Sequence, residues 1–339
     1  MSKLPLIGFR ESELKSYFES IGKRTFHARQ LLTWLYRKRV RDFNLMSDLP
    51  KSLRNELAEN FHLDILTPAD VAFDETDGSF KLLFVHENLT YETALIPDAD
   101  RFTVCLSVQS GCKFGCRFCA TGTLGFRGHL DTFHILQQLY NAYEFNDVTN
   151  IVYMGMGEPL DNAENVFSSL EILTSEWGFA FPARKITVST IGLMPQLQEL
   201  IDKTKVNIAI SLHSPFHDER KDLMPVERVH PIEDVLASVS WRIWPRTRRL
   251  TFEYILFRGI NDSLHHVKAL ARLARKYHAR VNLIRYNPID AKNGLESPAE
   301  PAVLQFEEWL RHMHVSVTLR KSKGRKIHAA CGMLAARKT

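Results

Sequence analysis

The stretch Ser110-Gly-Cys-Lys-Phe-Gly-Cys-Arg-Phe-Cys119 contains three cysteines, Cys112, Cys116 and Cys119, at the spacing C-x3-C-x2-C. It follows a strand-like run, Phe102 to Val108, so the three thiols are expected on one loop after a strand. Thiolates are the usual ligands of iron–sulfur clusters. Three sulfurs for the four irons of a cubane cluster leave one iron open, and an open metal position indicates a reactive site.

Two structural alternatives exist for this motif, a zinc ribbon and a fragment of a disulfide framework. A zinc ribbon needs a fourth ligand close by and usually a paired C-x2-C. No further cysteine follows closely, although His129 is available. The spacing therefore favours an iron–sulfur cluster.

The length and composition are those of a globular protein. The chain has 339 residues, of which 45% are hydrophobic and 24% charged, which suits one large domain and a small one. No apolar run approaches the roughly 20 residues of a membrane helix, and the segment Met1 to Gly8 lacks the apolar core of a signal peptide. Five cysteines, an odd number with three in one motif, favour a reducing cytoplasm over a disulfide scaffold.

The net charge of +5 is unevenly spread. Ile21 to Arg41 and Arg320 to Thr339 each carry seven Lys/Arg and no Asp/Glu, and Trp241 to Arg249 mixes four arginines with two tryptophans. Basic stretches with interleaved aromatic residues suit a phosphate backbone and unstacked bases. The alternative for each stretch is a solvated helix face. Together they favour a nucleic-acid partner.

Residues 1–90 are expected to form a separate accessory unit that binds RNA. Apolar spacing predicts helices over Glu13–Ile21 and Phe26–Tyr36, and a third helix that starts near Pro50, a residue suited to the first turn of a helix. Two strand-like runs, Phe80–Val85 and Leu89–Ile96, predict a β-hairpin linker around an Asn-containing turn.

Residues 91–319 alternate between strand and helix patterns, which predicts an α/β fold with a parallel sheet. Six strands, rather than eight, predict an incomplete (β/α)6 barrel. The expected strands are Val104–Val108, Ile151–Met154, Lys185–Ser189, Val206–Leu212, Thr251–Leu256 and Val281–Tyr286. The expected helices are Thr132–Phe145, Ala163–Glu176, Met194–Asp202, Ile232–Trp241, Ser263–Tyr277 and Ala302–His314.

Polar or glycine residues follow several of these strands, where the chemistry of β/α barrels is located. They are Gly157 and Glu158 after the second strand, Ser189 after the third, Ser211, Leu212 and His213 after the fourth, and Asn287 after the sixth. Glu158 can accept hydrogen bonds from an ammonium group, and Asn287 offers both a donor and an acceptor. Singly, a glycine turn, a helix-capping serine or a structural histidine would explain each one. Together they predict a pocket for a polar, zwitterionic cofactor.

The two remaining cysteines are Cys105, within the first strand, and Cys331, in a basic C-terminal tail over residues 320–339. Most free cysteines are buried and inert. Nearby Lys and Arg side chains favour the thiolate of Cys331, and a basic tail is an unusual place to bury a thiol for packing alone.

Two resemblances follow from these residues. Cys112, Cys116 and Cys119, with Phe118 before the last, resemble the radical S-adenosylmethionine (SAM) superfamily. Nearly the whole chain resembles the RlmN/Cfr family of radical SAM RNA adenine methyltransferases. The matching stretches are Phe26-His-Ala-Arg-Gln, Leu49-Pro-Lys-Ser-Leu-Arg, Tyr91-Glu-Thr-Ala-Leu-Ile-Pro, Cys105-Leu-Ser-Val-Gln-Ser-Gly-Cys, Met154-Gly-Met-Gly-Glu-Pro, Ser211-Leu-His-Ser, Asn282-Leu-Ile-Arg-Tyr-Asn-Pro and Ala329-Ala-Cys-Gly.

The resemblance implies a role for each candidate residue. Cys112, Cys116 and Cys119 would hold a 4Fe-4S cluster, and the strand-end residues Gly157, Glu158, Ser189, Ser211, Leu212, His213 and Asn287 would contact SAM. Cys331 would carry the methyl group, Cys105 would be its resolving partner, and Glu92 the proton acceptor. Two SAM molecules would be used per turnover. The partners would be 23S rRNA, with tRNA as a second candidate, and an electron-donor protein such as flavodoxin or ferredoxin. The protein would be a cytoplasmic monomer.

The chain also departs from the family pattern. Lys326, His328 and Met333 stand where the family tail more often has acidic residues and Gln. Arg285-Tyr286 is closer to Cfr, whereas Glu158-Pro159 is closer to RlmN. Methylation of carbon 2 of adenine is expected, with carbon 8 as the alternative. Two further hypotheses are a radical SAM enzyme for a small molecule and a non-catalytic RNA-binding iron–sulfur protein.

Overall fold

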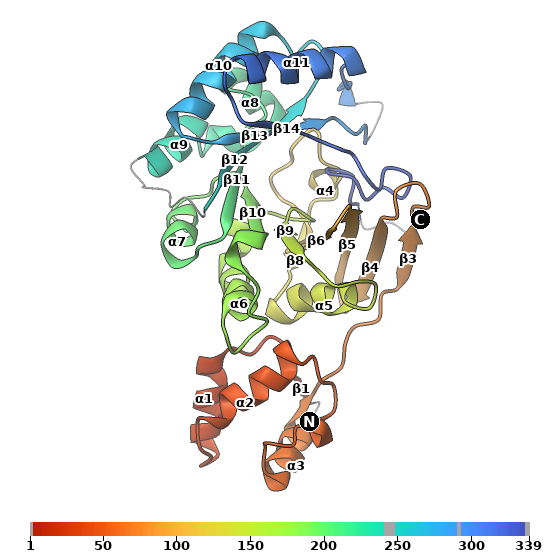
Figure 1. Ribbon diagram of the computed structural model, residues 1–339, viewed down its shortest axis with the longest axis vertical. Coiled ribbons are helices and arrows are strands. Elements are labelled where there is room, and N and C mark those ends of the chain that lie inside the picture. The colour runs from red at the N-terminus through yellow and green to blue at the C-terminus, as the bar shows by residue number, and fades with distance from the viewer. Residues whose placement is uncertain (1–2, 241–247, 290–292, 336–339) are drawn as a thin grey trace.

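The computed structural model describes residues 3–240, 248–289 and 293–335. A small N-terminal unit lies at one end of the molecule, beside one large α/β body with a ten-stranded sheet (Figure 1). Part of the Trp241–Arg249 stretch, residues 241–247, lies outside the described residues.

The N-terminal unit is helical, as its apolar spacing predicts. Its helices are α1 (Glu11–Ser20), α2 (His27–Leu32), which continues as a π-helical turn (Thr33–Arg37), and α3 (Lys51–Asn60). Two short parallel strands, β1 (Leu4–Pro5) and β2 (Phe61–His62), close the unit.

The helix that holds this unit to the large body is α5 (Thr132–Ala142), all of whose residues are buried. The Tyr140 hydroxyl donates to the carbonyl oxygen of Leu35 at 2.8 Å, and Gln137 Oε1 accepts from the Leu66 amide at 2.8 Å. The polar side chains of a helix that is buried between the sheet and a second unit need hydrogen-bond partners within the protein. These long-range bonds therefore join the two parts of the protein.

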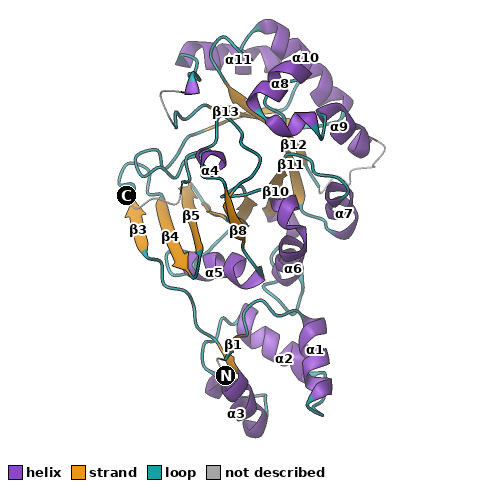
Figure 2. Ribbon diagram, turned by 180° about the vertical axis from the view of Figure 1, so that it is seen from behind, coloured by secondary structure: helices purple, strands orange, loops and turns teal. Residues whose placement is uncertain are grey.

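The sheet has the order β14-β13-β12-β11-β10-β9-β6-β5-β4-β3 and is open, with β14 and β3 at its edges. From β6 to β14 all neighbouring strands are parallel, whereas β3 to β6 are antiparallel. In the view from behind, β3, β4 and β5 lie side by side at one edge (Figure 2).

The six predicted parallel strands are confirmed, with ends that differ by a few residues. They are β6 (Arg101–Cys105), β9 (Asn150–Tyr153), β10 (Ile186–Thr190), β11 (Asn207–Ser211), β12 (Leu250–Leu256) and β13 (Arg280–Arg285). The structure adds a seventh parallel strand, β14 (Val317–Arg320), which pairs with β13. The sequence prediction missed β14 because a strand of four residues after a long helix carries little periodicity.

The predicted hairpin is also confirmed, as β4 (Phe80–His86) and β5 (Leu89–Asp98). Its strands, with β3 (Asp70–Phe73), extend the sheet of the barrel, because β5 pairs with β6 from Ala94↔Cys105 to Asp98↔Arg101. The boundary expected at residue 90 falls within this hairpin.

The six predicted helices are present as well. They are α5, α6 (Ala163–Thr174), α7 (Gln196–Lys203), α9 (Ile232–Ser240), α10 (Leu264–Lys276) and α11 (Glu300–His312). Two short helices were not predicted, α4 (Ala120–Thr123) and α8 (His217–Leu223). No helix among the described residues has the length and hydrophobicity needed to cross a membrane.

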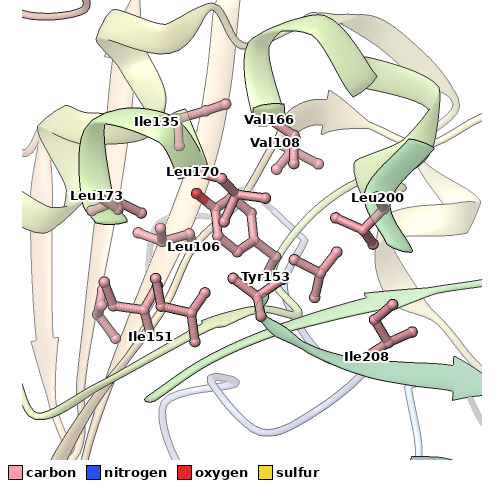
Figure 3. Close-up of a cluster of buried hydrophobic side chains, with 14 of the residues drawn as sticks. Leu106, Val108, Ile135, Ile151, Tyr153, Val166, Leu170, Leu173, Leu200 and Ile208 are labelled. Carbon is pink, nitrogen blue, oxygen red and sulfur yellow. The ribbon is translucent and has the colours of Figure 1, made fainter. Parts of the chain in front are cut away.

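Between the sheet and its outer helices lies an apolar core (Figure 3). Strand residues such as Ile151 and Ile208 pack against helix residues such as Leu170 and Leu200, all of them buried. Strands of a parallel sheet are covered on both faces, which explains why they were visible in the sequence as short apolar runs. Tyr153 is the polar exception, and its hydroxyl bonds Ser169 Oγ at 2.7 Å.

Ser107, just after β6, fixes the chain before the cysteine loop. Its amide donates to Gln138 Oε1 at 2.8 Å, and its hydroxyl accepts from the Met156 amide at 2.7 Å and donates to the Glu92 carbonyl. One buried residue thus connects β5, α5 and the loop after β9.

A two-stranded hairpin then carries the loop, with β7 (Gln109–Gly111) paired to β8 (Phe126–His129). Gly111 has φ of +77°, and a Cβ built there would lie 1.8 Å from the Gly125 carbonyl oxygen. Gly125 also has positive φ, but a Cβ there would meet nothing within 4 Å. Only glycine fits at 111, where two backbones touch.

We predict that Gly111→Ala separates β7 from β8 and prevents the cysteine loop from closing. The purified protein should contain much less iron and should melt at a lower temperature. Gly125→Ala is the matched control, since it carries the same positive-φ strain, about 1 kcal/mol, without the overlap. Equal iron content in both variants would contradict this account.

Candidate active site

The three cysteines of the motif lie between β7 and α4 and line one cavity of about 160 Å³. Backbone hydrogen bonds shape the loop: the Cys112 amide donates to the Gly125 carbonyl at 3.0 Å, and the Cys119 amide to the Cys116 carbonyl at 3.1 Å. The sequence predicted that these thiols would share one loop, and the structure turns all three toward the same cavity.

Most of the strand-end residues line the same cavity, as predicted. These are Gly157, Glu158, Ser189, Ser211 and His213. They come from the ends of three neighbouring parallel strands, β9, β10 and β11, whose carboxyl ends meet at one edge of the sheet. Gly157 has φ of +95°, and a Cβ there would lie 2.5 Å from Gln109, so this wall of the cavity requires glycine.

The Glu158 carboxylate is already engaged within the chain. It accepts hydrogen bonds from Thr190 Oγ1 at 2.5 Å and from the amides of Leu160 and Ile191, both at 3.1 Å. Burial raises the pKa of Glu158 to about 7, although these hydrogen bonds oppose the rise. Glu158 therefore joins the loop after β9 to the loop after β10, and a cationic group bound beside it would favour its charged form.

His213 is buried, and burial, with a smaller contribution from Arg220, lowers its pKa to about 3. The ring is therefore neutral at pH 7. Its Nδ1 accepts a hydrogen bond from the Ile255 amide at 3.1 Å, which places the ring proton on Nε2. The ring packs edge-on against Phe118, with 4.7 Å between the centroids, so His213 also supports the cysteine loop.

Two of the predicted SAM-contacting residues, Leu212 and Asn287, are not among those that line the cavity. Leu212 is fully buried, and its carbonyl oxygen accepts from Arg220 Nε at 3.2 Å. Asn287 is also buried, and its Nδ2 donates to the Cys331 carbonyl at 3.2 Å. Asn287 Oδ1 has no hydrogen-bond partner within the described residues, so it remains available as an acceptor.

Cys331 lines the cavity from the C-terminal tail, beside the three cysteines of the loop. Its neighbour Gly332 accepts from the Ala120 amide at 2.7 Å, which attaches the tail to the end of that loop. Cys105 is buried behind the cavity, packed with Ala94, Ile327 and Ala329. Burial first, and then the charge of Cys331, raise the pKa of Cys105 to about 12. Cys331 follows Ala329, which packs in the same cluster as Cys105, by two residues.

Glu92 lies on β5, fully buried, on the same face of the strand as Ala94. Its carboxylate forms an ion pair with Lys81 Nζ at 3.1 Å and accepts from the Ala335 amide at 2.9 Å. The sequence did not predict Lys81 as its partner. The carboxylate therefore lies against the C-terminal tail, and Glu92 is not one of the residues that line the cavity.

The structure adds two charged residues to the cavity wall, Glu253 on β12 and Arg320 at the end of β14. Glu253 is buried and accepts from Asn282 Nδ2 at 2.7 Å; burial raises its pKa, and Arg320 opposes that rise. A charge on Cys331 would raise the pKa of Arg320, burial opposes this rise, and the nearby Glu253 carboxylate adds to it. A single acid in the apolar run Leu250–Leu256 was the available signal for Glu253. Arg320 was missed together with its strand.

The donor set fits a cluster with one open iron. No three His, Cys, Asp or Glu side chains of the described residues are arranged to bind a single metal ion. The thiolates of a 4Fe-4S cluster bind three different irons, so they need not converge on one point. Cys112, Cys116 and Cys119 would hold such a cluster. The polar strand ends and the unpartnered Asn287 Oδ1 would hold a polar ligand beside it.

Of the basic stretches, the one in the N-terminal unit presents the more exposed surface. Arg24, Arg29, Lys38, Arg39 and the aromatic Phe26 are all exposed, Phe26 at 51%. In the Trp241–Arg249 stretch, by contrast, Arg248 is buried and its guanidinium donates to the carbonyls of Ile201 and Val206. Arg248 therefore stabilises the fold and does not face a partner.

Three thiols at the carboxyl edge of an open, mostly parallel α/β sheet define a radical SAM enzyme. Comparisons with known proteins agree. The profile of the radical SAM superfamily matches residues 106–274, and that described as "Ribosomal RNA large subunit methyltransferase N-terminal domain" matches residues 4–63.

Full-length relatives refine this class. The chain is 40% identical over 339 residues to a "Probable dual-specificity RNA methyltransferase RlmN" of Bacteroides fragilis (strain YCH46), covering 100% of this chain and 98% of that protein. It is 40% identical to the "Dual-specificity RNA methyltransferase RlmN" of Geotalea uraniireducens (strain Rf4), covering 99% and 98%. A crystal structure of a radical SAM methyltransferase from Sphaerobacter thermophilus superposes with a TM-score of 0.89 at 38% identity, over 98% of this chain and 100% of that one. The chain belongs to the RlmN family of radical SAM RNA methyltransferases.

We predict that His213 makes the protein less stable in mild acid. Its pKa is about 3 in the folded protein and about 6.5 when unfolded, so the unfolded chain binds more protons between these values. The contribution of the neutral His213 ring to stability is fully present above about pH 6.5. Below that pH, the free energy of unfolding decreases by up to about 1.4 kcal/mol for each unit by which the pH is lowered. Thermal melting of the anaerobic protein between about pH 7 and pH 5 should show a smaller loss for His213→Gln than for the parent. The exposed His312→Gln variant is the control, and an equal loss in all three would contradict the prediction.

We predict that Arg320→Gln slows the alkylation of Cys331 by iodoacetamide at neutral pH by about tenfold, because Arg320 lines the same cavity as Cys331 and a neighbouring cation promotes the reaction of a cysteine sulfur as a nucleophile. Arg320→Lys keeps the charge and should lose less. Peptide mass spectrometry would identify the labelled cysteine. An unchanged rate in Arg320→Gln would show that Arg320 does not act on Cys331.

Proposed function

We propose that this protein methylates carbon 2 of adenosine in 23S rRNA and in tRNA, through a methyl group carried on Cys331. The observation that carries the proposal is the position of Cys331 on the wall of the cavity that the three loop cysteines line, with Cys105 buried against Ile327 and Ala329 of the same tail. A radical SAM enzyme for a small molecule would have no use for a second pair of cysteines at this place.

The relatives support the choice of substrate. Those named above are described as dual-specificity RNA methyltransferases of the RlmN type, which favours carbon 2 and two classes of RNA. The Cfr-like residue Arg285 was the argument for carbon 8. Its guanidinium forms an ion pair with Glu300 at 2.8 Å and is not part of the cavity wall, so it gives no support to that alternative.

The electronic structure of adenine explains why a carrier is needed. A ring carbon flanked by nitrogens is electron-poor and cannot attack the electrophilic methyl group of SAM. A thiolate can, so Cys331 would accept that methyl group first, and Arg320 beside it would favour the thiolate. When bound, the cluster and a second SAM supply a 5′-deoxyadenosyl radical. Two SAM molecules are therefore consumed per turnover.

The S-methyl group of Cys331 would lose one hydrogen atom to that radical, and its carbon would add to carbon 2 of the adenine. Loss of one proton, and of one electron that the cluster would take back when bound, then leaves the base joined to Cys331 through a methylene group. Glu92 is the proposed proton acceptor. Its carboxylate accepts a hydrogen bond from the Ala335 amide, four residues after Cys331, so it lies against the segment that carries the methyl group.

Cys105 would release the product. Its thiolate attacks the Cys331 sulfur, the sulfur–carbon bond breaks with its electron pair on carbon, and a proton completes the methyl group. The resulting disulfide must be reduced by a thiol reductant before the next turnover. Burial raises the pKa of Cys105 to about 12, and the positive charge of Arg320 opposes that rise.

RNA would approach over the exposed basic and aromatic surface of the N-terminal unit, and its target base must be unstacked to reach the cavity. An electron donor such as flavodoxin or ferredoxin would reduce the cluster. We propose that the protein is cytoplasmic, because rRNA and reducing conditions are both found in the cytoplasm. We also propose that it is a monomer.

The direct test is methylation by the reconstituted protein with SAM, a reductant and RNA fragments, followed by mass spectrometry of the nucleosides. We expect 2-methyladenosine in both a 23S rRNA fragment and tRNA, and none with Cys331→Ala. Formation of 8-methyladenosine would select the alternative. SAM cleavage without any methylated RNA would overturn the proposal.

A further inference from the structure

The C-terminal tail, residues 321–335, crosses from β14 to the hairpin strands at the opposite edge of the sheet (Figure 1). There it meets an acidic rim, which we define as Asp74, Glu75, Asp77, Asp98 and Asp100. The proposed reaction uses none of these five residues. The rim faces a segment of opposite charge, because Arg320 to Lys326 contains five Lys/Arg.

Asp77 and Asp98 make the direct contacts. One oxygen of Asp77, Oδ1, accepts from the Ser79 amide at 3.0 Å within its own turn, and the other, Oδ2, accepts from the Gly324 amide at 2.7 Å. Asp98 forms an ion pair with Lys323 at 3.2 Å, and Lys323 also donates to the Pro97 carbonyl. Lys326, one of the departures from the family pattern, donates to Thr76 Oγ1. The turn between β3 and β4 and the end of β5, which lie at the same end of these strands, thus bind the start of the tail.

The directions of the pKa shifts of Asp77 and Asp98 agree with these contacts. Burial alone would raise the pKa of Asp77, but hydrogen bonds from Ser79 and Gly324 lower it. Arg101 and then Lys323 lower the pKa of Asp98. Both carboxylates are therefore charged at neutral pH.

The bound segment then folds into a compact turn. Gly324 is buried with φ of +70°, its carbonyl accepts from the Ala329 amide at 2.8 Å, and a Cβ on it would lie 2.9 Å from that of Ala329. The turn places Ile327 and Ala329 against Ala94 and Cys105. Cys331 follows two residues later. Its position is thus determined on one side by the acidic rim and on the other by the bonds to Asn287 and Ala120.

We propose that Asp77 and Asp98 are positioning residues for Cys331: they bind the start of the tail and thereby hold the thiol at the cavity wall, over Cys105. The functional meaning of this placement rests on the proposed function. The placement itself can be measured without any methyl transfer.

The test uses the iron–sulfur-loaded, reduced protein and a polyethylene-glycol maleimide, which is too large to react with a closed tail. The double variant Asp77→Asn/Asp98→Asn removes the two contacts: Asn at 77 can still accept from Ser79, but turns an NH2 group toward the Gly324 amide. We expect Cys331 to be labelled about tenfold faster, as peptide mass spectrometry would show, since two surface contacts of this kind are worth about one factor of ten. The absorbance of the cluster should not change.

Three further variants separate positioning from general effects. Asp100→Asn removes the same charge from the rim at a residue with no contact to the tail and should label at the parent rate. Asp98→Glu keeps the ion pair and should remain slow. Gly324→Ala opens the turn by steric overlap and should label as fast as the double variant.

Labelling of the double variant at the parent rate, or an equal increase in Asp100→Asn, would overturn the inference. The proposed function fails by a different result. If the double variant labels fast, but the parent protein incubated with SAM carries no S-methyl group on Cys331, the rim still holds the tail and the methyl-carrier role is wrong.

Discussion

Hydrogen bonds around Ser107 are the interaction on which the rest of the site depends. This one buried residue joins the hairpin strand β5 through Glu92, the helix α5 through Gln138 and the loop after β9 through Met156. Five residues later Cys112, the first cysteine of the motif, follows. The same contacts therefore fix the cysteine loop, the strand that carries Glu92 and the glycine-containing wall of the cavity relative to one another. A shift in the position of any one of the three connected elements would therefore displace the other two.

The site also has to accommodate several buried charges. Arg320 lies close enough to Glu253, Cys105 and Cys331 that each of these groups contributes to the pKa of another. Buried charges are costly unless they are paired, and here the groups around Arg320 include two thiols. His213 does not carry the cost of a buried charge, because its ring is neutral at pH 7. Among the described residues, Arg320 is thus the only Lys or Arg that lines the cavity, and Cys331 lines it as well.

Much of this arrangement could be predicted from the sequence, and the exceptions have physical reasons. The six central strands are covered on both faces, so their apolar runs were visible, and the cysteine spacing predicted that three thiols share one loop, which lines the cavity. β14 has only four residues, and its absence from the prediction removed Arg320 as well. The Lys81–Glu92 ion pair joins neighbouring strands and has no signature along the chain. The basic tail was interpreted as a nucleic-acid surface, whereas Lys323 and Lys326 bind the hairpin of the same chain. Interactions that depend on which distant residues meet are the ones that a single sequence does not reveal.

The central claim is that Cys331 carries the methyl group to RNA and that Cys105 releases it. It is tested most directly by purifying the Cys105→Ala variant anaerobically from cells and running it on a denaturing gel before and after RNase treatment. Our account predicts covalently attached RNA that RNase trims, with the trapped adenosine joined to Cys331 through a methylene group. A variant free of RNA, with its cluster and SAM cleavage intact, would contradict the account.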